Sequence, residues 1–244
     1  SKLNLKKEEY YFEVRDLILS NINKLSTNLL KHMVLSILNY AINKMISGDE
    51  KYLKEISLLN RIMDENSLAL TGESLHGDYF YSVIEHATMQ NEISWAAEFA
   101  EKYKSYLSYD NRDSLISLGL SRIDFERKNY TSSLQRLLSV DNVSPYFYLS
   151  HKILLLQNYM ELMELEAALQ IIETLSKYLK RRIDIASELK DNYLKFLHYY
   201  RKLKNVISGK HYLAKSLSKE LDREKFFLQK RWLVEKVDMI KKKK

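Results

Sequence analysis

The chain of 244 residues has no cysteine, one proline, five glycines and no run of 18 apolar residues. Without cysteine it cannot form disulfides, thiol nucleophiles or thiolate metal sites. An all-β fold needs turn residues about every 8–12 positions, so this composition favours long helices joined by short polar loops. The lack of a long apolar run or apolar leader predicts no membrane span, and we predict a cytoplasmic protein.

Outside the four C-terminal lysines, the chain has only a small excess of positive over negative charge. The net charge is +7, and Lys241–Lys244 supply four of these charges, which leaves 7 − 4 = +3 for the rest. Acidic and basic residues are mixed along most of the chain, which is typical of a solvated surface rather than a concentrated nucleic-acid-binding stripe. The chain begins with Ser1 and not with Met, so we expect it to be part of a longer protein.

Apolar residues recur with helical spacing along nearly the whole chain. This pattern predicts an all-α fold of about eleven helices, arranged as about five antiparallel helix hairpins plus a C-terminal capping helix. The segment 67–78 holds two of the five glycines and is the longest predicted loop. We therefore predict N-terminal helical hairpins at residues 1–66, a loop or hinge at 67–78, and a helical repeat region with its cap at 79–244, within one continuous domain.

Two segments of the sequence superimpose at an offset of 34 residues. In each segment an aromatic residue is followed by a small residue and then by an apolar residue. The aligned pairs are Phe125 with Tyr159, Ser133 with Ala167, and Leu137 with Ile171. A 34-residue period in a helical chain is typical of tetratricopeptide-type hairpins. Small side chains let helix backbones approach to about 8–10 Å, so we expect Ala96, Ser133 and Ala167 at close helix crossings.

At these residues the chain resembles the tetratricopeptide-repeat (TPR) superfamily, as a degenerate member. Two units match this pattern, at about residues 114–147 and 148–181. The runs Ser94–Tyr103, Tyr146–Tyr159 and Trp232–Lys236 are also similar to a group of bacterial helical-repeat proteins. The resemblance implies a right-handed α-solenoid, and it implies no activity.

The sequence contains no recognised catalytic, cofactor or metal-binding constellation, since it lacks paired-histidine motifs and a glycine-rich phosphate loop. We therefore predict a protein that is not an enzyme and has no cofactor or metal. The resemblance implies a scaffold that presents a concave surface to a protein or peptide. In such arrays the first helix of each hairpin lines the concavity, and the candidate partner-binding residues are Arg122, Glu126, Lys152, Leu156 and Tyr159. Charge reversal at Arg122 and Lys152 is expected to weaken binding without unfolding the chain.

Two alternatives from other classes stay open. The basic C-terminal third could bind nucleic acid or another anionic surface through a set of cations. These are Lys180, Arg181, Arg182, Arg201, Lys202, Lys204 and Arg231. The chain could also be the sensor or oligomerisation part of a longer regulatory protein.

Three further residue sets have structural interpretations. Trp95 is expected to pack in the core, and Trp232 is expected to cap the open face of the last hairpin. The carboxylates Glu161, Glu164 and Glu166 are expected at a solvated hairpin corner.

Overall fold

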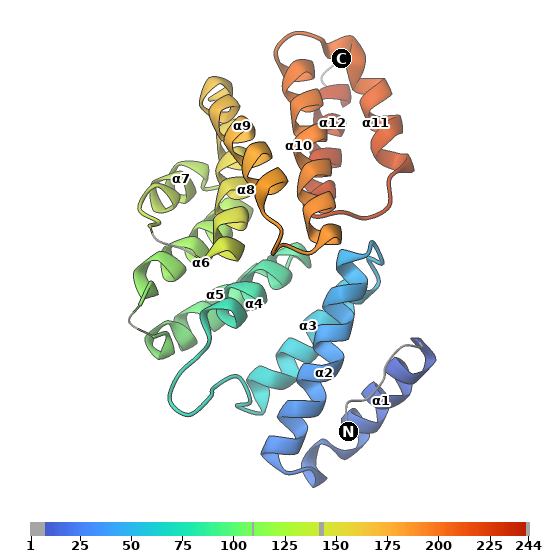
Figure 1. Ribbon diagram of the computed structural model, residues 1–244, viewed down its shortest axis with the longest axis vertical. Helices are drawn as coiled ribbons and strands as arrows, with labels where there is room; N and C mark the ends of the chain where they lie inside the picture. Colours follow the sequence, from blue (N-terminus) through green and yellow to red (C-terminus); the bar gives the residue numbers. More distant parts are fainter. Residues whose placement is uncertain (1–7, 109, 142–143, 243–244) are drawn as a thin grey trace. The chain divides into compact units, whose positions relative to one another are not determined.

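The computed structural model describes residues 8–108, 110–141 and 144–242. Within these ranges the chain is helical and has no β-strand, which confirms the predicted all-α class (Figure 1). The α-helices are α1 (Glu8–Asn21), α2 (Thr27–Ile46), α3 (Tyr52–Glu65), α4 (Gly77–Met89), α5 (Ile93–Tyr103), α6 (Arg112–Glu126), α7 (Tyr130–Leu138), α8 (Pro145–Glu161), α9 (Leu165–Arg181), α10 (Ser187–Ile207), α11 (Ala214–Arg223) and α12 (Lys230–Lys242). Lys243 and Lys244, two of the four C-terminal lysines, and residues 1–7 of the predicted N-terminal hairpin region lie outside the described residues.

The chain divides by its internal contacts into two compact units. The first unit comprises Ser1–Lys44 and Lys51–Tyr148, and the second comprises Met45–Glu50 and Leu149–Lys244. The segment 67–78 lies inside the first unit, where it connects α3 to α4. This connection is packed, because Leu68 and Leu75 are each 2% exposed.

Three hairpins, α4/α5, α6/α7 and α8/α9, reverse direction through the same backbone turn. The turn residues Asn91, Lys128 and Met163 have positive φ angles of 63°, 64° and 61°. In each turn the next amide donates to the carbonyl five positions earlier, and these bonds are Glu92 to Ala87 at 2.9 Å, Asn129 to Asp124 at 2.9 Å, and Glu164 to Tyr159 at 2.8 Å. This is the Schellman motif, which satisfies carbonyls at the helix end while it turns the chain back.

The spacing of these turns corrects the predicted offset of 34 residues. Lys128 and Met163 are 163 − 128 = 35 residues apart. The buried small residues follow the same spacing, since Ser133 and Ala168 are both 0% exposed (168 − 133 = 35), whereas Ala167 is exposed. Because Ala167 and Ala168 are adjacent, the sequence allows either one to be aligned with Ser133. The turn at Met163 makes Ala168 the buried counterpart of Ser133.

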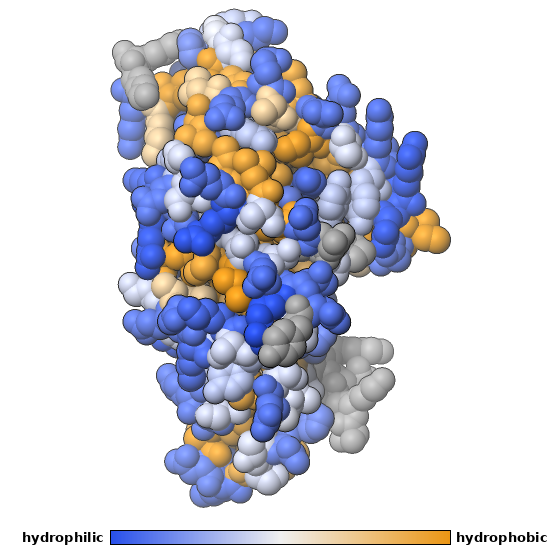
Figure 2. Space-filling view, turned by 90° about the vertical axis from the view of Figure 1, so that its left-hand side faces the viewer, coloured by the Kyte–Doolittle hydropathy of each residue, from blue (hydrophilic) through white to orange (hydrophobic). Residues whose placement is uncertain are grey.

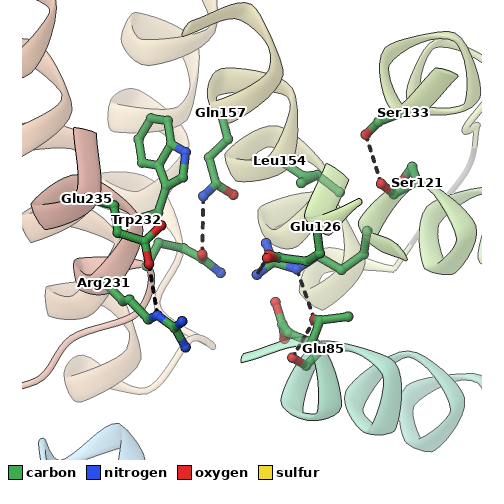
Figure 3. Close-up of polar contacts among 12 residues, drawn as sticks. Glu85, Ser121, Glu126, Ser133, Leu154, Gln157, Arg231, Trp232 and Glu235 are labelled. Atoms are coloured by element: carbon green, nitrogen blue, oxygen red, sulfur yellow. Dashed lines mark hydrogen bonds and ion pairs between the residues drawn. The ribbon is translucent and has the colours of Figure 1, made fainter. Parts of the chain in front are cut away.

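Small residues lie at the helix crossings of the first unit. Ala96 and Ser133 are both fully buried, as predicted. The Ser133 Oγ donates to the backbone carbonyl of Ser121 at 2.8 Å, and so it links α7 to α6 (Figure 3). A larger side chain at Ser133 would separate α7 from α6, and one at Ala96 would move α5 away from its neighbours.

An acidic side chain on α3 connects that helix to α5. Asp64 accepts hydrogen bonds from the Trp95 Nε1 at 3.3 Å, the Lys102 Nζ at 2.6 Å and the Tyr103 hydroxyl at 2.9 Å. Trp95 is half-buried, and the Arg61 guanidinium lies 4.5 Å from the centre of its ring. Trp95 therefore packs at the seam between α3 and α5, through both its ring and its indole nitrogen.

The shared turn yields a stability prediction. Changing Lys128 to Gly removes the Cβ that disfavours a left-handed conformation, a gain that exceeds the extra unfolded-state entropy of glycine. We expect Lys128→Gly to raise the free energy of unfolding by up to about 1 kcal/mol in a urea titration. Arg127→Gly is the matched control, because Arg127 has a φ of −75° and gains nothing from glycine. Equal losses in both variants would contradict this account of the turn.

A buried histidine on α4 yields a pH prediction. His86 is 4% exposed, its Nδ1 lies 3.2 Å from the Ser82 Oγ, and burial lowers its pKa to about 4 from an ordinary 6.5. Above pH 6.5 both states are neutral, whereas between about 6.5 and 4 only the unfolded chain gains the proton. The free energy of unfolding should therefore decrease as the pH is lowered from about 6.5 to 4, by at most about 1.4 kcal/mol per pH unit. Urea titrations should show this fall reduced in His86→Gln and unchanged in His198→Gln, whose histidine is exposed.

Candidate functional site

The two predicted partner-binding residues of the first unit, Arg122 and Glu126, lie one turn apart on α6. Arg122 is 3% exposed, and its Nη2 lies 2.8 Å from the Glu126 Oε1. Its Nε donates to the Thr88 Oγ1 of α4 at 3.2 Å, and this hydroxyl donates to the Glu85 carbonyl at 2.9 Å (Figure 3). Arg122 therefore connects α4 to α6 in the interior, where the sequence predicted an accessible side chain.

The close approach of α6 to α4 explains why Arg122 is enclosed. A Cβ on Gly119 would lie 2.8 Å from the Ile84 Cδ1 and 3.2 Å from the Phe80 Cε1, both on α4. A Cβ at this position would require the end of the Ile84 side chain and the Phe80 ring to shift, so glycine favours this close packing, and Arg122 follows it on the same helix. An isolated glycine in a helical pattern was the available sequence signal for this contact.

The other three predicted residues, Lys152, Leu156 and Tyr159, lie on α8 in the second unit. Leu156 is 0% exposed, and its carbonyl accepts a hydrogen bond from the Tyr200 hydroxyl of α10 at 2.8 Å. Lys152 is half-buried, and burial lowers the pKa of its ammonium group. Tyr159 is also half-buried, and burial together with the charge of Glu164 raises its pKa. Of these three side chains, Lys152 and Tyr159 retain access to solvent.

The C-terminal helix α12 contacts both α8 and α10. Trp232 is 7% exposed, and its ring lies 6.2 Å from those of Tyr200 and Phe196, nearly parallel to Tyr200 at 16°. Its Nε1 donates to the Glu161 Oε1 of α8 at 2.7 Å, and the Lys236 Nζ donates to the Glu161 Oε2 at 2.5 Å. Glu161 was predicted at a solvated corner, and that prediction is wrong because two donors from α12 cover it.

A cleft of about 450 Å³ lies in the first unit beside the N-terminal ends of α4 and α6. Its lining includes the exposed side chains of His76 and Asp78, whose Nδ1 and Oδ2 lie 3.6 Å apart. Leu115 supplies part of the apolar lining. The polar groups on this lining are surface side chains of mixed chemistry, so the cleft by itself defines no ligand class.

The predicted basic patch is interleaved with carboxylates. Four of its seven cations have acidic neighbours, and these pairs are Arg182 with Asp184, Lys202 with Glu220, Lys204 with Glu166 at 3.6 Å, and Arg231 with Glu235 at 2.9 Å. Arg201 donates to the Ser176 Oγ at 2.7 Å, while Lys180 and Arg181 are exposed at the end of α9. These carboxylates reduce the positive potential that phosphate binding would require.

Comparisons of the chain with protein-family models, with curated proteins and with solved structures found no match. In the described part of the chain, no helix combines the length and the apolar character needed to cross a membrane. The same residues contain no group of three histidine, aspartate or glutamate side chains that could hold a metal ion.

The burial of Arg122 changes the expected result of charge reversal. Arg122→Glu places a carboxylate beside Glu126 in the interior and removes the link to Thr88. We expect it to lower the free energy of unfolding by about 3–5 kcal/mol in a urea titration. Arg127→Glu is the charge-matched control on the exposed end of the same helix, and it should cost no more than about 1 kcal/mol. If Arg122→Glu is tolerated as well as the control, Arg122 is not the interior link described here.

Proposed function

We propose that this chain is a noncatalytic interaction scaffold of the TPR-like type, which binds a protein or peptide segment. In this proposal the hairpins form a right-handed array, and the first helix of each hairpin faces the partner. The all-helical fold and the packed hairpins support the proposal. The arrangement of the hairpins as a right-handed α-solenoid is what the resemblance to the TPR superfamily implies.

The observation that carries the proposal is the repetition of one hairpin design. Asn91, Lys128 and Met163 form the same turn, and a fully buried small residue, Ala96, Ser133 or Ala168, follows each turn at the fifth position. Within the first unit, α4 packs on α6, so the first helices of two successive hairpins are neighbours. Stacked hairpins that contact mainly their neighbours leave extended helix faces available to a partner.

The described surface suits a protein partner better than a nucleic acid. Polar and charged side chains cover most of the face in Figure 2, and patches of hydrophobic side chains interrupt them. Leu138 and Met163 are among the exposed large apolar residues, at 65% and 62%. Apolar contact area stabilises protein association, whereas the cations of the basic patch are largely paired within the chain.

Site-specific cross-linking tests the proposal. A photoreactive phenylalanine analogue replaces Tyr159, which is half-buried on α8, or the matched control Tyr212, which is 72% exposed outside the α-helices. In a native lysate treated with nuclease, we expect a discrete protein adduct at position 159 that is at least three times stronger than at position 212. Adducts of equal strength at both positions, or adducts that disappear with nuclease, would refute the scaffold.

A further inference from the structure

The second unit contains a stretch of sequence that has no acidic residue. Residues 192–219 include seven lysines and arginines and neither aspartate nor glutamate. Three of the lysines reach carboxylates outside the stretch, and these pairs are Lys195 with Glu224, Lys202 with Glu220, and Lys204 with Glu166. The excess positive charge therefore lies on the cations that remain.

Three of the remaining cations lie close together at the start of α11. Lys210, Lys215 and Lys219 are exposed, and none of them has an ion-pair partner in the described part of the chain. Lys215 and Lys219 are four residues apart on α11, so their side chains project from the same side of that helix. Tyr212 is 72% exposed and lies in the short turn that leads directly into α11. The residues that we call the α11 face are Lys210, Tyr212, Leu213, Lys215 and Lys219.

Helix capping does not explain the lysines of the α11 face. The N-terminal end of a helix carries partial positive charge, which favours acidic side chains in the first turn. The first turn of α11 has no acidic residue, and Lys215 lies there instead. Lys241 and Lys242, by contrast, lie at the C-terminal end of α12, where the helix dipole favours lysine. The charge of the α11 face opposes the local preference, so an external group of negative charge would stabilise it.

Exposed apolar side chains accompany these lysines at one end of the second unit. The C-terminal ends of α8, α10 and α12 lie at that end (Figure 1), where Lys236 of α12 pairs with Glu161 of α8. Large apolar side chains are exposed at or next to these helix ends, and they are Met163 at 62%, Tyr212 at 72%, Leu213 at 36% and Met239 at 48%. Apolar side chains beside cations match the interface of a lipid bilayer, where tyrosine rings lie at the level of the headgroups.

A lipid surface fits this set of side chains better than a nucleic acid does. Leu213 and Met239 are aliphatic, so they gain by burial at the boundary of the acyl chains and offer no ring on which a base could stack. The three free cations of the α11 face are lysines, which act as point charges towards phosphate groups. Arginine, whose planar fork suits nucleic-acid recognition, is absent from the face.

We propose that the α11 face, together with Met239, attaches the protein to a bilayer that contains anionic phospholipids. Lys210, Lys215 and Lys219 lie among the lipid phosphates, while Tyr212 and Leu213 insert between the headgroups. The attachment is peripheral and reversible, because few apolar side chains insert. This inference goes beyond the scaffold proposal, since it uses different residues and a different ligand.

Co-sedimentation of the full chain with lipid vesicles tests the inference. One set of vesicles contains phosphatidylcholine alone, and the other also contains about 30% phosphatidylserine. We expect the chain to sediment with the phosphatidylserine vesicles only. Changing Lys210, Lys215 and Lys219 together to glutamine should weaken this binding by about tenfold or more, because each lysine near an anionic surface adds to the attraction. Equal binding to both sets of vesicles, or no binding to either, would overturn the inference.

A second triple variant controls for net charge. It carries glutamine at Lys54, Lys128 and Lys180, which are exposed lysines outside the α11 face. Both triple variants lose three positive charges, so a nonspecific effect of net charge would weaken both equally. We expect the control variant to bind within about threefold of the unaltered chain. Equal losses in the two variants would contradict a specific lipid-binding face.

A nitroxide label on the chain with its lysines intact gives a second readout. Because the chain has no cysteine, His211→Cys provides a single labelling site beside Tyr212, and Ser94→Cys on α5 provides the control. Both positions are exposed. With phosphatidylserine vesicles, collisions of the label at 211 with a water-soluble nickel complex should decrease by about threefold or more, while those at 94 stay unchanged.

A label at 211 that stays in contact with water on the vesicles would overturn the inference, because the face would then not insert. A DNA duplex that displaces the chain from the vesicles, at equal phosphate concentration and with the label still in water, would assign the same lysines to nucleic acid and also overturn it. Protection of the label at 211 alone, with loss of binding in the Lys210, Lys215 and Lys219 variant, would establish the α11 face as the membrane contact.

Discussion

The left-handed turn shared by the hairpins α4/α5, α6/α7 and α8/α9 is the constraint on which their helical arrangement depends. Asn91, Lys128 and Met163 adopt it at the ends of α4, α6 and α8. The hydrogen bond from the following amide to the carbonyl five residues earlier fixes where each returning helix begins. That start determines which small residue meets the partner helix. The buried residue is therefore Ala168 and not Ala167. A shift of one residue rotates a helical side chain by about 100°, which separates an interior position from a solvated one.

Much of the fold could be predicted because helical periodicity and glycine or proline scarcity act locally. The all-α class and the burial of Ala96 and Ser133 follow from such local signals. The site could not be predicted in the same way. Arg122 has the sequence environment of a surface residue, and its burial comes from the packing of α6 on α4, where it bonds Thr88. The right-handed array and its concave face stay predictions.

The partners of charged residues could not be predicted either, because tertiary contacts determine them. Glu161 follows an apolar run and precedes a turn, a context that favours solvent exposure. Its donors, Trp232 and Lys236, lie more than 70 residues further along the chain, and no local pattern connects them. The basic C-terminal third likewise appears as an excess of cations in sequence, yet two of its cations, Lys202 and Lys204, pair with acids on neighbouring helices.

We propose that this chain binds a protein or peptide segment on the first helices of its hairpins. Hydrogen exchange of the full chain, free and with a partner isolated by cross-linking, tests this proposal most directly. We predict slower exchange in α4, α6 and α8 when the partner is bound. Unchanged exchange in these three helices in the complex would contradict it.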